Sequence, residues 1–219
     1  MNDQLILKFP THKAYQKEDY YVSPSNQEAY DFINSWPKWI KRIVNIFGPS
    51  GSGKSHLAFI LKLKTQCLLV DSNEINEKIF LKFKTKETLI IENLCENISE
   101  KLLFSLWNIA LQDNKYVLIT SKKPINSYNF KLPDLISRVN SGLILGINLP
   151  SDDLISVILA KNFSDKQIKV EKKHIDYIIK RIDRSYEKIS QFVLTLDKYS
   201  LEKGGSFSLK MIKEVLKMV

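Results

Sequence analysis

The stretch that decides the fold is GPSGSGKS, Gly48 to Ser55, which matches the phosphate-binding pattern G-x-x-x-x-G-K-[ST] in full. An apolar run, RIVNIF (42–47), precedes it, and HLAFILKLK (56–64) has the pattern of a helix. Glycines let the loop fold tightly, so that its N–H groups and the helix N-terminus face phosphates. Lys54 would then reach the terminal phosphates and Ser55 a magnesium ion. A glycine-rich turn without a ligand is the alternative, and the strand-to-helix context disfavours it.

The rest of the chain alternates strands with helices as far as Pro150. Four more strands are expected, at CLLVD (67–71), TLIIEN (88–93), KYVLITS (115–121) and GLILGINL (142–149), and helices at 26–36, 74–83 and 99–114. Apolar strands separated by helices predict a parallel sheet covered on both faces. The expected fold class is therefore α/β: a five-stranded nucleotide-binding core over residues 21–150.

Beyond Pro150 the pattern contains no convincing strand. Helices are expected near 151–162, 171–183, 185–202 and 208–217, with Ser151 or Asp152 and Ser208 as N-caps. We therefore expect a small all-helical lid over residues 151–219, and an N-terminal segment over residues 1–20 ahead of the core.

Composition narrows the class of protein. The 219 residues include no apolar run long enough to cross a bilayer and no signal peptide, so a cytoplasmic protein without membrane contact is expected. The net charge is +9, but the lysines are spread along the chain, which favours weak or no direct DNA binding. Cys67 and Cys95 are expected to be buried thiols.

The strand TLIIEN ends in the pair Glu92-Asn93. A carboxylate at this strand end can accept from the water shell of a magnesium ion, and Glu92 is one methylene longer than the Asp usual there. Asn93 stands where ATPases place a second acid. An amide can orient a water but cannot take its proton, so little intrinsic hydrolysis is expected. An ordinary polar turn is the alternative.

Three further residues are candidates for phosphate chemistry. Thr120 and Ser121 end a neighbouring strand, where hydroxyls would approach a terminal phosphate or simply cap a turn. Arg138, in LPDLISRVNSGL (132–143), is one of only four Arg among 33 basic residues. A guanidinium inserted into another subunit's site accelerates phosphoryl transfer by about 10³- to 10⁵-fold, whereas a surface salt bridge is the simpler role.

The N-terminus carries a short apolar motif. QLILKF places Gln4 ahead of Leu5, Leu7 and Phe9, a spacing typical of peptides that dock apolar anchors into a partner's groove. A strand that packs on this chain's own core is the alternative.

Together these motifs resemble the AAA+ module of the bacterial replication initiator DnaA, and more closely the short Hda-type (HdaA) regulators that inactivate DnaA. The matching stretches cover nearly the whole chain. They are YYVSPSNQEAYDFINSWP (20–37) for the adenine side, GPSGSGKSHLA (48–58) for Walker A, TLIIEN for Walker B, LITSKKP (118–124) for sensor 1, LISRVNSGL (135–143) for box VII and RIDRSYEKISQFVLTLDKYS (181–200) for the sensor 2 helix.

The resemblance implies a P-loop AAA+ core with a helical lid, ADP or ATP with Mg as cofactor, and Arg138 as an arginine finger that acts in trans. It implies that Gln4, Leu5, Leu7 and Phe9 bind the DNA polymerase III sliding clamp (beta subunit), that DnaA is the partner whose ATP is hydrolysed, and that re-initiation is thereby prevented. It also admits a homodimer. The implied nucleotide-binding residues are Tyr21, Val22, Gly48, Pro49, Ser50, Gly51, Ser52, Gly53, Lys54, Ser55 and His56.

Three positions depart from the family's pattern. Lys122 follows sensor 1 where DnaA has Asp, Glu92 replaces the Walker B Asp, and Glu187 stands where the sensor 2 Arg is expected, with Lys188 and Arg184 nearby.

Two other classes of protein remain open. GPSGSGKS also occurs in guanylate-kinase-like nucleotide kinases, which however begin with the loop near the N-terminus and clamp two nucleotides with several Arg. The second alternative is a helicase loader of the DnaC type, or another adaptor, that binds DNA through its basic surface.

Overall fold

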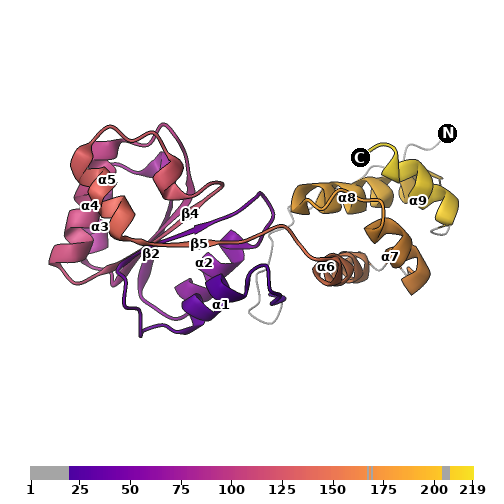
Figure 1. Ribbon diagram of the computed structural model, residues 1–219, viewed down its shortest axis with the longest axis horizontal. Coiled ribbons are helices and arrows are strands. Elements are labelled where there is room, and N and C mark those ends of the chain that lie inside the picture. Colours follow the sequence, from indigo (N-terminus) through magenta and orange to yellow (C-terminus); the bar gives the residue numbers. More distant parts are fainter. Residues whose placement is uncertain (1–19, 167, 169, 204–207) are drawn as a thin grey trace, which may run out of the picture.

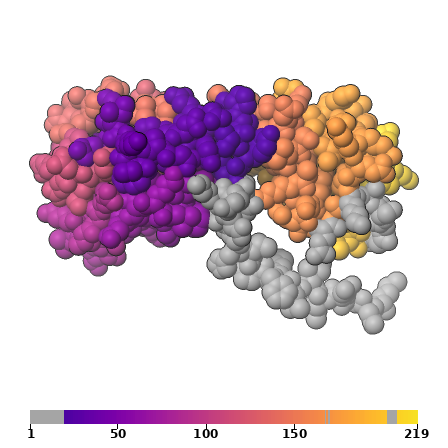
Figure 2. Space-filling view, turned by 90° about the horizontal axis from the view of Figure 1, so that it is seen from below, coloured from indigo at the N-terminus to yellow at the C-terminus, as the bar shows by residue number. Residues whose placement is uncertain are grey.

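A computed structural model describes residues 20–166, 168, 170–203 and 208–219. An α/β part and an all-helical part lie end to end (Figure 1), and the space-filling view shows them as two adjoining lobes (Figure 2). In the described part of the chain, no helix has both the length and the apolar character needed to span a bilayer.

The α/β part is built on one parallel sheet, with the strand order β2-β3-β4-β1-β5. The strands are β1 (Ile43–Phe47), β2 (Cys67–Asp71), β3 (Thr88–Leu94), β4 (Tyr116–Ser121) and β5 (Leu143–Gly146). Because the strands are parallel, their carboxyl ends meet at one edge, where ligands of open α/β sheets bind. The structure confirms the predicted five-stranded α/β core.

Helices cover both faces of the sheet (Figure 1). On one face lie α1 (Gln27–Asn34) and α2 (Lys54–Lys62), and on the other α3 (Glu77–Lys84), α4 (Glu100–Gln112) and α5 (Pro133–Ser141). Each face has its own apolar core, centred on Leu57 and Ile46 on the first side and on Trp107 and Phe83 on the second. The sequence pattern did not predict α5, which carries Arg138.

The sequence prediction began the third helix three residues early. A 3₁₀ turn, η2 (Ser72–Glu74), occupies that place, because the Asp71 side chain accepts from the backbone N–H of Asn73. The α-helix begins only after Asn76, whose side chain caps the N–H of Lys78. A second 3₁₀ turn, η3 (Ile125–Ser127), follows β4.

The helical part consists of α6 (Asp152–Asp165), α7 (Lys172–Ile179), α8 (Tyr186–Lys203) and α9 (Leu209–Leu216) in the described residues. The hydroxyls of Ser151 and Ser208 cap α6 and α9, as the sequence predicts. A separate apolar core holds these helices together and includes the fully buried Phe192 and Leu196.

One buried polar residue links the central strands to the loop after β4. Asn45, on β1, is 2% exposed, and its amide donates to the Ile119 carbonyl at 3.1 Å and to the Ser121 hydroxyl at 2.8 Å. Its carbonyl oxygen accepts from the N–H of Ile125 at 2.9 Å. This residue therefore fixes the end of β4 against the strand that leads into the phosphate-binding loop.

We expect Asn45→Ala to lower the free energy of unfolding by roughly 3 kcal/mol, because three hydrogen bonds are lost and the buried Ile125 N–H keeps no partner. Urea denaturation measures this loss. Asn126→Ala, at an exposed position of η3, is the control and should stay within about 0.5 kcal/mol of the parent. Equal losses in the two variants would contradict the role of Asn45.

Candidate nucleotide-binding site

The loop between β1 and α2 has the backbone of a phosphate-binding loop. Gly51 and Gly53 have φ of 80° and 92°, a region that residues with a side chain rarely adopt. A Cβ at Gly53 would lie 2.8 Å from the ring of Tyr20, and one at Gly51 would lie 3.0 Å from the Cβ of Tyr186. Both glycines are therefore required by conformation and by close packing.

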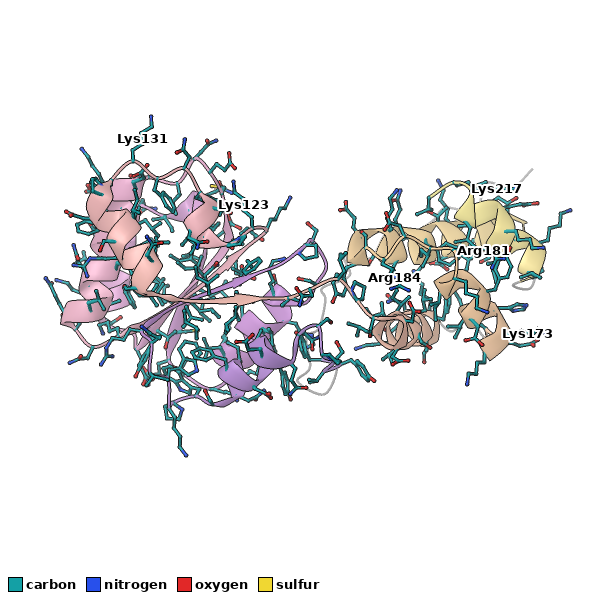
Figure 3. The ribbon with its side chains drawn as sticks, in the orientation of Figure 1. Lys123, Lys131, Lys173, Arg181, Arg184 and Lys217 are labelled. Atoms are coloured by element: carbon teal, nitrogen blue, oxygen red, sulfur yellow. The ribbon has the colours of Figure 1, made fainter. Side chains whose placement is uncertain are left out.

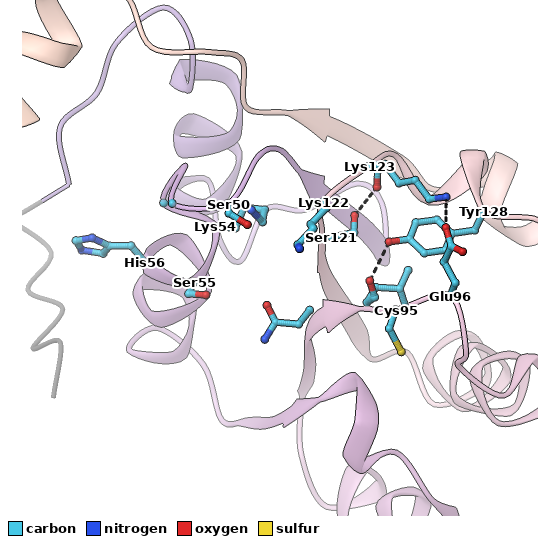
Figure 4. A pocket seen from close by; sticks show the side chains of 14 residues that line it. Ser50, Lys54, Ser55, His56, Cys95, Glu96, Ser121, Lys122, Lys123 and Tyr128 are labelled. Atoms are coloured by element: carbon cyan, nitrogen blue, oxygen red, sulfur yellow. Dashed lines mark hydrogen bonds and ion pairs between the residues drawn. The ribbon is translucent and has the colours of Figure 1, made fainter. Parts of the chain in front are cut away.

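A cavity of about 850 Å³ opens beside this loop, at the carboxyl ends of β3 and β4 (Figure 4). It includes eight of the residues predicted from sequence: Ser50, Gly51, Gly53, Lys54, Ser55, His56, Asn93 and Ser121. It also includes Leu94, Cys95, Glu96, Lys122, Lys123 and Tyr128. The volume is in the usual range for small-molecule sites.

The other three predicted loop residues, Gly48, Pro49 and Ser52, lie outside the cavity lining. The Lys54 ammonium donates to the carbonyl oxygens of Gly48 and Pro49, each at 2.8 Å, which holds it over the loop. Ser52 is buried, and Gly48 packs so closely on Ile147 that a Cβ would lie 2.8 Å from its carbonyl oxygen.

Two lysines, Lys54 and Lys122, make one side of the cavity cationic. Burial lowers the pKa of Lys54, the charge of Lys122 lowers it further, and the Glu92 carboxylate partly offsets both. Lys122 lies toward the Lys54 side of the cavity in Figure 4. The residue that departs from the DnaA pattern after sensor 1 thus adds a second positive charge beside the phosphate-binding loop.

Glu92 is the acidic residue that the sequence assigns to the magnesium ion. One of its carboxylate oxygens, Oε1, is buried and has no hydrogen-bond partner among the described residues. Glu92 does not line the cavity, but its charge acts on Lys54, and such an oxygen suits the water shell of a magnesium ion held on phosphates. The described residues contain no cluster of three His, Cys, Asp or Glu that would hold a metal without a nucleotide.

Asn93 lines the cavity, and its side-chain amide is bound to a neighbouring strand end. It has φ of 55°, in the left-handed region that Asn tolerates, at an irregularity in the pairing of β3 with β4. Its side-chain amide donates to the Asp71 carboxylate at 2.8 Å, and this bond is the main cause of the lowered pKa of Asp71. The local backbone therefore accounts for Asn at this position, and its catalytic role stays a prediction.

The hydroxyls of Thr120 and Ser121 are engaged within the protein. Thr120 accepts from the N–H of Asn93 at 3.1 Å, and Ser121 donates to the carbonyl of Lys123 at 2.7 Å. Both side chains are about 1% exposed. They hold the strand ends in register beside the cavity, and contact with a phosphate stays a prediction.

Arg138 does not line the cavity. It lies in the last turn of α5, half-buried, with its guanidinium carbon 5.3 Å from the centre of the Phe104 ring on α4. Among the described residues no carboxylate forms an ion pair with it. An aromatic ring thus supports the guanidinium and leaves its donors available to an external anion.

The helical part presents a tyrosine to the loop instead of a sensor 2 cation. Arg184 is paired with Asp152 at 2.9 Å, Lys188 donates to the backbone oxygen of Val219 at 2.5 Å, and Glu187 is exposed. Tyr186 is 5% exposed, packs on Gly51 and donates to the Asn148 carbonyl at 3.2 Å. In the sequence, the only indication that Tyr186 belongs to this site is its position directly before Glu187.

Tyr21 and Val22, the predicted adenine-side pair, directly follow Tyr20, whose ring lies against Gly53 of the loop. Tyr20 stacks on Tyr30 at 5.5 Å and meets His56 edge-on at 5.2 Å, whereas Tyr21 is 46% exposed. Burial raises the pKa of Tyr20. The predicted clamp motif, Gln4, Leu5, Leu7 and Phe9, lies outside the described residues.

The chain shares this fold with P-loop proteins of the AAA+ type. Domain III of the Thermotoga maritima replication initiation protein DnaA superposes with a TM-score of 0.79 at 18% identity, over 96% of this chain and 98% of that one. AMPPCP-bound DnaA from Aquifex aeolicus gives 0.72 at 17% identity, over 91% of this chain and 69% of that one. The Holliday junction branch migration motor RuvB of Thermotoga maritima gives 0.62 at 16% identity, over 81% and 61%.

By sequence, the chain is homologous to the ATPase domain of DnaA. It is 27% identical to the chromosomal replication initiator protein DnaA of Borrelia turicatae over 236 residues, which is 93% of this chain and 48% of that protein. It is also 24% identical to an uncharacterized protein of Haemophilus influenzae, over 79% of this chain and 80% of that one. The chain thus spans about half the length of the DnaA relatives, and no protein-family model matches it.

We expect Asn93→Asp to lower stability at pH 7, because it places a second carboxylate within hydrogen-bond distance of Asp71. Repulsion raises the pKa of the pair, so the destabilisation is present above that pKa and disappears as the pH falls through it. Urea midpoints for parent and variant between pH 4 and 8 measure this dependence. A pH-independent difference between parent and variant would contradict it.

Proposed function

We propose that the chain is a nucleotide-binding AAA+ regulator of replication initiation that resembles Hda. In this proposal it holds ADP or ATP in its own cavity and presents Arg138 to ATP bound by DnaA. The observation that carries the proposal is the separation of these two functions: a phosphate-binding cavity around Lys54, and an Arg138 that lies outside it and has no ion pair among the described residues.

Nucleotide binding is supported by the loop geometry and by the charges around it. Backbone N–H groups of the loop, together with the ammonium groups of Lys54 and Lys122, suit the phosphates of ADP or ATP. A magnesium ion would be held by the phosphates, the Ser55 hydroxyl and, through water, Glu92. That ion would neutralise phosphate charge. Structural relatives include a DnaA bound to AMPPCP.

Weak hydrolysis in cis follows from the acids near the cavity. The Asn93 amide is occupied by Asp71, and an amide cannot accept a proton from water. Glu96 lines the far end of the cavity, but Lys123 pairs with it at 2.6 Å and lowers its pKa, which makes it a weaker base. We therefore assign this chain's nucleotide a structural role.

Partner contacts complete the proposal. DnaA is proposed as the partner that receives Arg138, and Gln4, Leu5, Leu7 and Phe9 as the residues that dock on the sliding clamp. A homodimer is compatible with this arrangement. The nucleotide kinase alternative is less well supported, because Arg184 is tied to Asp152 and Arg138 lies away from the cavity.

We expect this protein, with clamp loaded on DNA, to accelerate hydrolysis of DnaA-bound ATP, and Arg138→Ala to reduce the stimulated rate by at least about 100-fold. The readout is conversion of labelled ATP to ADP on DnaA. Arg42→Ala is the matched control, because Arg42 also lies over an aromatic ring, 5.2 Å from the centre of Tyr116. In the same assay, Gln4→Ala should act only at higher protein concentration.

An Arg138→Ala variant as active as the parent would remove the arginine-finger mechanism. Equal activity with and without the clamp would remove the docking part of the proposal and leave the finger in place. Rapid phosphate transfer to a nucleoside monophosphate would favour the kinase class instead.

A further inference from the structure

The fold gathers basic residues that are dispersed in the sequence onto one surface of the helical part. Lys210, Lys213 and Lys217 recur at the i, i+3, i+7 spacing of one helical face, and all three are exposed. They lie opposite the side of α9 that buries Met211, Ile212 and Val215. The exposed Lys173 and Arg181 stand on and just after α7, and Figure 3 shows both, with Lys217, on this part of the molecule.

Tyr177 joins these two groups of cations. The guanidinium carbon of Arg181 lies 3.8 Å from the centre of the Tyr177 ring, and the Lys213 ammonium lies 5.7 Å from the same centre. The Arg181 side chain also donates to the Tyr177 carbonyl at 3.4 Å. Stacking on the ring orients the guanidinium in advance of ligand binding, which lowers the entropy cost of a contact.

The surface keeps most of its charge. Among the described residues, Lys173 pairs with the exposed Glu171 at 2.5 Å, whereas no carboxylate forms an ion pair with Arg181, Lys210, Lys213 or Lys217. Glu214, the acid on α9, is held by the Tyr199 hydroxyl at 2.5 Å. Four cations that form no ion pair with a described carboxylate give this surface the positive charge that an extended polyanion would meet.

We propose that the basic lid surface, made of Lys173, Tyr177, Arg181, Lys210, Lys213 and Lys217, binds the phosphate backbone of duplex DNA. A duplex presents about one negative charge per 1.7 Å of axis, and the three lysines of α9 extend over about 10 Å. Single-stranded DNA is usually bound by aromatic rings that stack on bases. Here the Tyr177 ring already carries Arg181, so the surface offers backbone contacts without base stacking.

The proposal goes beyond the nucleotide site and does not depend on it. The sequence favoured weak or no direct DNA binding because the lysines are spread along the chain. Helical periodicity and the contact between α7 and α9 bring them together in space.

The test is fluorescence anisotropy of a labelled 20-bp duplex of arbitrary sequence with the full chain, over a range of salt concentrations. We expect binding whose affinity falls steeply with salt, and a Lys210→Gln/Lys213→Gln/Lys217→Gln variant at least about 10-fold weaker at low salt. Its log-log salt slope should be shallower by about 2 to 3. Arg181→Gln, which leaves α9 intact, should also weaken binding, and circular dichroism checks the fold of each variant.

Lys38→Gln/Lys62→Gln/Lys101→Gln is the control, because it removes the same charge from exposed positions outside the helical part. The proposal predicts that this control binds the duplex within about twofold of the parent. An equal loss in the control would reduce the effect to net charge and overturn the proposed surface. Unchanged binding by the α9 variant would also overturn it, as would tighter binding of single-stranded DNA or of polyglutamate of equal charge.

Discussion

The contact on which the rest of the structure depends is the packing of two tyrosines against the glycines of the phosphate-binding loop. Tyr20 comes from the segment before α1 and lies against Gly53, and Tyr186 begins α8 and lies against Gly51. A Cβ at Gly53 would collide with the Tyr20 ring, one at Gly51 would lie tightly against Tyr186, and both glycines have positive φ. The loop is therefore held from both sides, and its backbone N–H groups are positioned by the α/β part and the helical part together.

This constraint explains what the cavity contains. The helical part approaches the loop with the Cβ and backbone of Tyr186, while Arg184 and Lys188 are bound elsewhere. Positive charge near the phosphates comes instead from Lys54 and from Lys122 at the end of β4. Arg138 lies on a different surface, where the Phe104 ring supports it. The result separates a site that holds a ligand from a side chain that is available to a partner.

Much of this could be predicted from sequence, because strand and helix periodicity and the GPSGSGKS motif are local signals. Parallel strands end at one edge of their sheet, so the strand pattern alone predicts that Glu92 and Ser121 share that edge. What could not be predicted depends on contacts between distant segments. The positive φ of Asn93, its bond to Asp71 and the packing of Tyr186 on Gly51 have no local signature, and neither does the meeting of Tyr177 with Lys213.

The separation of the nucleotide site from Arg138 is tested most directly by calorimetric titration of ADP into the parent, Lys54→Ala and Arg138→Ala proteins. We predict that Lys54→Ala loses affinity by at least about 10-fold, since charge-assisted hydrogen bonds to phosphate are lost. Arg138→Ala should bind within about twofold of the parent, because the side chain lies outside the cavity. If Arg138→Ala loses as much affinity as Lys54→Ala, the arginine serves this chain's own nucleotide and the proposed separation is wrong.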